Sequence, residues 1–434
     1  MANSAEVVRT HWLYEWVDEY NIKTRDDLVR HAGIPAALER LHEIAGKVPA
    51  WYEQPTLQER SIVAGGTLDL SGRITCGAAV CAKKRIDRIF GQIWHYFDSI
   101  VVEGPSARST VRALETMKKR DRPQFFFHLW EEIDLLLYAR EIGIVDNLAF
   151  REKPHAFCDH HLRENAAQAG VAAAVDENLR SEIADELKKS STIKIVPEGD
   201  SWRYFISNPE FSETFSGTYR HPSKKGAKPS KRQVAEAAVR RCSATLVYDA
   251  AMSRRLELPL VQEFAFLWSD RDAGREAKNL ESRVALELPL PVLQGLTARD
   301  IVKFRADHKP HFERFQHALT EAIREQADRV GTDSPERIAA AVNEDFIRPA
   351  MADIERSMIE TKKLFGMKSG TSVAVGTAIA GAGILSSIPL VIASGLGAAV
   401  TVTLASANSY LDSKKDAKLS DVYFLWKAAK MHGK

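Results

Sequence analysis

The chain has 434 residues, of which 60 are Lys or Arg and 58 are Asp or Glu, and its formal net charge at pH 7 is +2. This nearly balanced charge excludes a strong overall attraction to nucleic acid or acidic lipid. Four cysteines, Cys76, Cys81, Cys158 and Cys242, are too few for a disulfide-based fold, and the charges near the N-terminus argue against a signal peptide. We therefore expect a cytoplasmic protein of two or three domains.

Residues 1–60 are expected to form a helical segment in which Thr24, followed by two acidic residues, begins a helix. Residues 61–213 predict a mixed α/β region. Its pattern consists of a short strand at 67–70, an amphipathic helix over 78–97, a buried strand at 100–102 and an apolar helix over 125–141. Residues 163–189 are expected to be helical and solvated. The β-formers on either side of residues 197–200 predict a β-hairpin.

Residues 214–235 form a basic stretch without an acidic residue, and we expect a loop or linker there. Its cations between Arg220 and Arg232 suggest contact with phosphates as an alternative to a solvated loop. Residues 236–296 are expected to continue the core, with a helix around Asp249 that leads to an apolar strand. Residues 297–366 then predict a long helical hairpin, because apolar residues recur at helical spacing on both sides of a turn at 331–335.

The most distinctive stretch lies in residues 367–411, where the chain from Ser369 to Leu411 has no charged side chain. Pro389 divides this run, because proline donates no backbone hydrogen bond and restricts the residue before it. The pattern predicts an apolar, Gly/Ala-rich helical hairpin. Lysines flank both ends, and positive residues favour the cytoplasmic side of a membrane, so both ends are expected on one side. Residues 412–434 form a basic aromatic tail that suits a lipid interface.

Three interpretations of this run remain open. The hairpin engages a membrane, or it is buried in a soluble core or oligomer interface, since buried helices are also apolar all round. The third is an unstructured segment. Small residues let two helices approach closely. The residues expected at the membrane are Gly376, Ala380, Gly383, Pro389, Gly395, Val400 and Trp426.

Two sets of residues are candidates for metal binding. Zinc prefers thiolate and imidazole ligands at short spacings, which Cys76, Cys81, His155 and Cys158 offer. Magnesium-dependent nucleases gather carboxylates at the end of a parallel sheet, and Asp98, Glu103, Asp134 and Asp249 are candidates for such a catalytic site. Unliganded cysteines and solvated acids are the competing interpretation in each case, so no cofactor is our first expectation.

No phosphate-binding loop, nucleophile elbow or dinucleotide-binding fingerprint occurs in the sequence. We expect an α+β, predominantly α fold with a small mixed α/β layer, a long antiparallel helical pair and the C-terminal apolar helical hairpin. The leading hypothesis is a non-enzymatic protein that conditionally engages or permeabilises the inner face of the membrane, in the manner of a bacterial defence effector. Its partners would be membrane lipid and a protein partner or a second copy of itself. The alternatives are a metal-dependent nuclease or hydrolase on the α/β layer, and a soluble oligomeric interaction protein with the hairpin buried.

Overall fold

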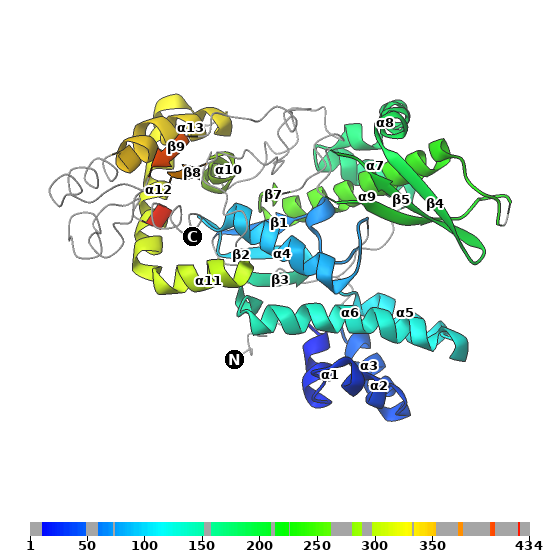
Figure 1. Ribbon diagram of the computed structural model, residues 1–434. Coiled ribbons are helices and arrows are strands. Elements are labelled where there is room, and N and C mark those ends of the chain that lie inside the picture. Colours follow the sequence, from blue (N-terminus) through cyan, green and yellow to red (C-terminus); the bar gives the residue numbers. More distant parts are fainter. Residues whose placement is uncertain are drawn as a thin grey trace, which may run out of the picture. The chain divides into compact units, whose positions relative to one another are not determined.

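A computed structural model describes residues 11–48, 60–72, 74–151, 158–209, 213–224, 226–261, 280–288, 297–331, 334–352, 372–375, 400–403 and 424–425. The predicted fold class is confirmed: the protein is mostly helical, with a small parallel sheet and a separate antiparallel sheet (Figure 1). The chain divides into two compact units. Unit 1 holds the described residues from 11 to 86 and from 98 to 261, and unit 2 holds residues 87–97 with the described residues from 280 onward.

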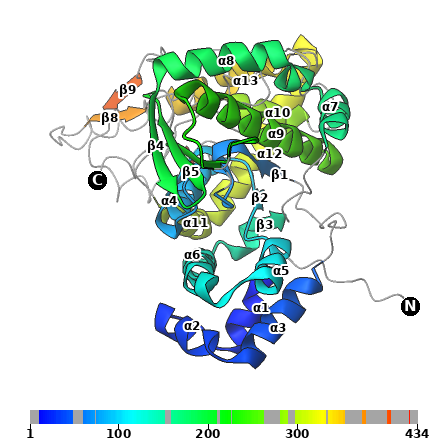
Figure 2. The ribbon, with the colours of Figure 1, turned by 90° about the vertical axis from the view of Figure 1, so that its right-hand side faces the viewer.

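The N-terminal part of unit 1 is helical, as predicted. It contains α1 (Leu13–Glu19), α2 (Arg25–Ala32) and α3 (Pro35–Gly46). Thr24 caps α2 in a reciprocal arrangement, because its hydroxyl accepts from the Asp27 amide while the Asp27 carboxylate accepts from the Thr24 amide. The apolar faces of these helices share one core with α6 (Arg122–Glu141), in which Trp16 and Ile133 are fully buried. Figure 2 shows the three helices beside α5 and α6.

A four-stranded parallel sheet is the centre of unit 1. It consists of β1 (Ser61–Ala64), β2 (Ser99–Glu103), β3 (Leu148–Arg151) and β7 (Leu260–Val261), in the order β3-β2-β1-β7. The helix α4 (Ala79–Ile93) follows β1, within the range predicted for a helix, and α5 (Ala107–Thr116) follows β2. The strand expected at 67–70 is wrong, since that segment begins with a short 3-10 helix, Gly66–Leu68, and the strand lies before it. Because all four strands are parallel, their carboxyl ends meet at one edge of the sheet.

A second, antiparallel sheet of unit 1 contains β4 (Thr192–Glu198), β5 (Ser201–Ser207) and β6 (Phe215–Tyr219). The predicted hairpin is confirmed as β4 and β5, whereas β6 was missed inside the expected linker. The region expected to be helical over 163–189 contains α7 (Asp159–Gln168) and α8 (Glu177–Ser190), and Gly170 takes a left-handed φ of 69° between them. The long α9 (Lys231–Leu256) packs against both sheets through a shared apolar core. The remaining 3-10 helices of unit 1 are Lys119–Asp121, Val145–Asn147 and Ala172–Val175.

Unit 2 is helical in its described part and contains α10 (Leu280–Glu287), α11 (Ala298–Asp307), α12 (Lys309–Val330) and α13 (Pro335–Val342). The side chains of Thr297 and Ser334 cap α11 and α13, by accepting from the amides of Asp300 and Arg337. The predicted long first helix is divided at His308, because Pro310 in the first turn of α12 cannot continue the hydrogen bonds of α11. The return helix is shorter than expected, since α13 passes into a π-helical segment, Asn343–Ile347.

The aromatic tail does not lie entirely at a lipid interface, contrary to the expectation for residues 412–434. Phe424 is fully buried in unit 2, with its ring 5.3 Å from that of Trp94, 5.0 Å from that of Phe304 and 4.8 Å from that of Phe312. Large rings in such contact bury much apolar surface, which stabilises the position of Phe424 in this unit. Trp426 lies outside the described residues.

Only eight residues of the apolar run are described, and they form an antiparallel pair of strands, β8 (Ser372–Val375) and β9 (Val400–Thr403), in which Val375 is opposite Val400. Helix was expected there. The β-branched residues of these two segments favour a strand. Gly376, Ala380, Gly383, Pro389 and Gly395 lie outside the described residues. Among the helices that the structure describes, none combines the length and hydropathy of a membrane-spanning segment.

Candidate functional site

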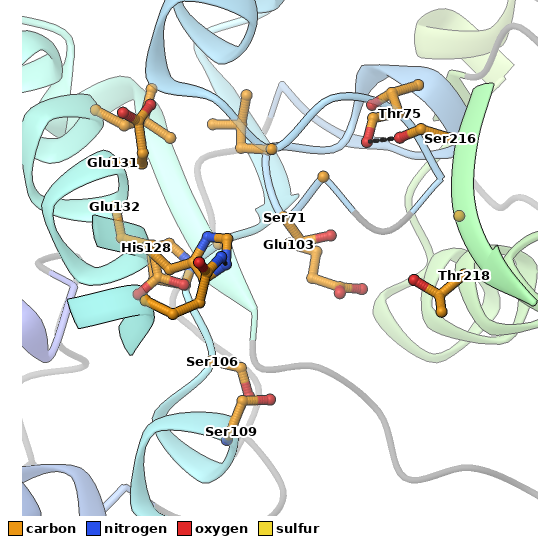
Figure 3. A pocket seen from close by; sticks show the side chains of 18 of the residues that line it. Ser71, Thr75, Glu103, Ser106, Ser109, His128, Glu131, Glu132, Ser216 and Thr218 are labelled. Carbon is orange, nitrogen blue, oxygen red and sulfur yellow. Dashed lines mark hydrogen bonds between the residues drawn. The ribbon is translucent and has the colours of Figure 1, made fainter. Parts of the chain in front are cut away.

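A polar cavity of about 740 Å³ lies in unit 1 at the carboxyl edge of the parallel sheet. Residues 70–72, after β1, and residues 103–106, after β2, form one part of its wall. The helix α6 forms a second part, and β6 with α9 forms a third. In Figure 3 the carboxyl group of Glu103 lies between the α6 side chains and those of β6. Ligand sites in α/β proteins occur at this edge, where loops from several strands converge.

The loop after β1 is held by Asp249, which α9 presents to it. The fully buried carboxylate accepts from the Gly66 amide at 2.8 Å and forms an ion pair with Arg151 at the end of β3. A Cβ on Gly65 would lie 2.4 Å from Oδ2 of Asp249, so only glycine fits beside this carboxylate. Arg151 is 3% exposed, so the pair is almost completely removed from water. Asp249, on α9, therefore connects the loop after β1 to the end of β3, directly beside the cavity.

The end of β2 supplies the buried carboxylate of the cavity. Glu103 is 0% exposed, and its register partner on β3 is Arg151, the residue that binds Asp249. The turn that follows is fixed from the N-terminal helices, since His11 Nε2 and Trp12 Nε1 lie 2.9 Å and 3.2 Å from the Pro105 carbonyl oxygen. Burial lowers the pKa of His11 to about 4, so the ring is neutral and Nε2 donates while Nδ1 accepts from the Leu13 amide.

The helix α6 forms the second part of the wall with His128, Glu131 and Glu132 (Figure 3). The Glu131 carboxylate accepts from the Ala79 amide at 2.5 Å, at the first residue of α4. A negative charge is favourable at that position because the first amides of a helix have no partner within it. His128 Nε2 lies 2.7 Å from the Gln124 side-chain nitrogen. Glu131 therefore connects α6 to the first residue of α4 and also places a negative charge on the cavity wall.

The third part of the wall is basic and hydroxylic. Arg203 on β5, Arg241 on α9 and Thr218 on β6 line it, together with Gly217. A Cβ on Gly217 would lie 2.4 Å from Oη of Tyr204 and 2.6 Å from Nη1 of Arg241. The missing side chain thus makes room for the phenol and the guanidinium to lie over β6.

Of the four predicted catalytic carboxylates, one lines the cavity. Glu103 lies in its wall, whereas Asp249 is bound by Arg151 and the Gly66 amide beside it. Asp98 precedes β2, at the opposite edge of the sheet, and lies 3.6 Å from Arg60. Asp134 forms an ion pair with Lys83 at 2.7 Å. The four acids do not converge as the nuclease hypothesis requires.

The predicted zinc ligands are only partly brought together. Cys76 and Cys81 contact each other, and burial together with this contact raises the pKa of the Cys81 thiol. Cys158 is exposed and lies 3.1 Å from Nδ1 of His161, while His155 is outside the described residues. Within the described ranges, no three metal-binding side chains of the His, Cys, Asp and Glu types come together.

The basic loop from Arg220 to Arg232 is held against unit 1 at several points. The Trp202 indole donates to the Gly226 carbonyl at 3.0 Å, and the Lys228 ammonium lies 5.8 Å from the centre of the same indole. Arg232 lies 3.0 Å from Glu236. These contacts occupy cations that were expected to be available for phosphates, and nucleic-acid binding by this loop stays a prediction.

Most of the cavity wall was not predicted from the sequence. The missed residues that carry its chemistry are Ser71, Ser106, Ser109, His128, Arg203, Thr218 and Arg241. The position directly after a predicted strand was the available signal for Ser106. No local pattern indicates the others, because they come from helices and from a second sheet.

The described part of the chain is a mostly helical α+β protein with a polar cavity at the carboxyl edge of a parallel sheet. Compared with family models, curated proteins and solved structures, the chain matches none. Its function is therefore argued from its own residues.

Proposed function

We propose that this protein binds a small polar molecule in the cavity of unit 1 and engages a membrane through the uncharged run from Ser369 to Leu411. The observation that carries the proposal is the cavity itself. Its volume of about 740 Å³ lies within the range of about 300–1,000 Å³ that is typical of small-molecule sites. Such a protein would act on the membrane of its own cell in response to the bound molecule, as a bacterial defence effector does.

The course of the chain around the run supports the second half of the proposal. Ile347, before the run, and Phe424, after it, are both buried in unit 2. The described residues that flank the run on its two sides therefore belong to the same unit. A two-pass hairpin needs both of its ends on one side of the bilayer, and lysines flank both ends of the run.

The membrane half is tested by expressing the chain in bacteria and washing the isolated membranes with carbonate. We expect part of the wild-type protein to stay in the membrane fraction. Ala380→Asp with Val400→Asp should move it to the soluble fraction, because a charge at the bilayer centre costs about 2.5–3.5 kcal/mol by insertion scales. Val80→Asp with Val330→Asp is the matched control, since both of these valines are exposed.

Three outcomes are informative. Wild-type protein that washes off completely contradicts membrane engagement. A double variant that unfolds while the control pair stays folded favours the run as a buried core. Oligomers of the purified protein that persist in light scattering without detergent or lipid, with no membrane retention, favour the soluble interaction protein.

A further inference from the structure

The basic wall of the cavity contains an arginine, Arg241, that a bound anionic group could pair with. Arg241 lines the cavity, and among the residues that the structure describes no carboxylate pairs with it. Its neighbour Arg240, by contrast, lies on the outer side of α9 and pairs with Glu177 at 3.2 Å. A guanidinium that lines a polar cavity without an anionic partner is a ready-made site for an anionic group.

The position of Arg241 is fixed by its surroundings. Its Nη1 and the Tyr204 hydroxyl both lie over Gly217, where a Cβ would be 2.6 Å from the first and 2.4 Å from the second. Tyr204 is 2% exposed, and burial raises the pKa of its phenol, so the hydroxyl stays protonated beside the cation. Arg203 lies on the same wall but forms an ion pair with Glu198, which also lines the cavity, at 3.6 Å, so Arg241 is the cation that this wall offers to an anionic group.

The α6 part of the cavity is acidic and is unfavourable for an anion. Glu131 and Glu132 line it, and the carboxyl group of the fully buried Glu103 lies between α6 and β6 (Figure 3). Ser71, Ser106 and Ser109 add hydroxyl groups to the cavity wall. Carboxylates and hydroxyls of this kind accept from, and donate to, the hydroxyl groups of a ligand. The charges of the two walls are therefore arranged for a ligand with one anionic and one hydroxyl-bearing end.

We propose that the cavity binds a phosphorylated sugar compound of nucleotide size, with a phosphate on Arg241 and the sugar hydroxyls toward Glu103. A phosphorylated organic compound is favoured over a free inorganic ion, because the cavity, at about 740 Å³, accommodates a much larger molecule than such an ion. This inference rests on the proposed ligand-binding function and names its ligand class.

The inference is tested by calorimetric titration of the full-length protein with two matched pairs of probes, adenosine with AMP and ribose with ribose 5-phosphate. We expect the phosphorylated member of at least one pair to bind about tenfold or more tightly than its partner, the gain of a charge-assisted hydrogen bond to phosphate. Arg241→Gln should remove this preference. Arg241→Lys should keep part of it, because lysine retains the charge without the planar fork.

Arg240→Gln is the matched control, because it removes the same group from the next residue of α9, outside the cavity wall. It should leave all affinities unchanged. Equal affinity within both pairs, or a phosphate preference that survives in Arg241→Gln, overturns the inference while leaving ligand binding intact. If none of the four probes binds to protein that circular dichroism shows to be folded, the inference and the proposed ligand binding are both contradicted. Thermal melting of Arg241→Gln and Arg240→Gln separates a loss of binding from a loss of folding.

Discussion

The buried pair of Arg151 and Asp249 gives the most direct test of how unit 1 is held together. The proposed change is Asp249→Asn, which keeps the shape of the side chain and an oxygen that can accept from the Gly66 amide, but removes the charge. Arg151, at 3% exposed, then keeps a buried positive charge without its carboxylate. The carboxylate of Asp249 itself is 0% exposed, so water cannot replace it.

The magnitude follows from this burial. Removing one partner of a buried ion pair typically costs about 3–5 kcal/mol, because the remaining charge is left uncompensated. The hydrogen bond from Gly66, at 2.8 Å, also becomes weaker when its acceptor is neutral. Removing both charges, as in Asp249→Asn with Arg151→Met, removes the uncompensated charge as well. The double variant should therefore be more stable than Asp249→Asn alone.

Hydrogen-exchange mass spectrometry measures this loss within unit 1. In Asp249→Asn, peptides from β1, β3 and α9 should exchange at least about a hundredfold faster than in the wild type, the equivalent of about 3 kcal/mol. Peptides from α12 should be unchanged, because they belong to unit 2. An unchanged exchange rate in β1 and β3 would refute the reasoning. So would a double variant whose loss equals the sum of the two single losses, since that would mean the charges do not interact.

Two other substitutions test local features of the structure. Gly65→Ala places a Cβ 2.4 Å from Oδ2 of Asp249 and should lower the melting temperature of unit 1 by several degrees, while Gly46→Ala, with no atom within 4 Å, should not lower it. Glu287→Gln tests a pH dependence in unit 2, where burial and then the nearby Glu336 raise the pKa of the Glu287 carboxyl to about 7, with Arg283 acting in the opposite direction. Between about pH 4.5 and 7 the folded protein holds a proton that the unfolded chain has released, so the free energy of unfolding falls as pH rises, by roughly 3 kcal/mol across the window. Urea unfolding at pH 5 and pH 8 should show this fall in the wild type and lose it in Glu287→Gln; equal pH dependence in both proteins would contradict the assignment.

The fold could be predicted from the sequence where local patterns are strong. Apolar residues at helical spacing located α4 and α6, and the β-branched residues at 100–102 located β2. The capping residue Thr24 marked a helix start correctly. These features depend on residues close together in the chain, so the information is present in a short window.

The strands β1, β3 and β6 were missed because their stability depends on partners far away in the sequence. β1 has only four residues, all buried, and such a short run is not distinguishable from part of a helix by periodicity. In β6 the glycine at 217 weakens the strand signal, yet it is required there by Tyr204 and Arg241. The same residue that obscures the strand therefore shapes the basic wall of the cavity.

Four acids were grouped as one predicted catalytic site, and their positions on the sheet explain why residue types alone could not support that grouping. Asp98 and Glu103 lie at the two ends of β2, and in a parallel sheet the two ends of a strand face opposite edges. Only the carboxyl end is next to the loops that build a site. Glu103 thus lies in the cavity while Asp98 does not, although both were equally plausible as acids near a strand. The ion pair of Asp249 with Arg151 uses a second of the four acids for structure. An anion beside Glu103 and the acidic side chains of α6 would be repelled, and we therefore expect the phosphate of the proposed ligand at Arg241.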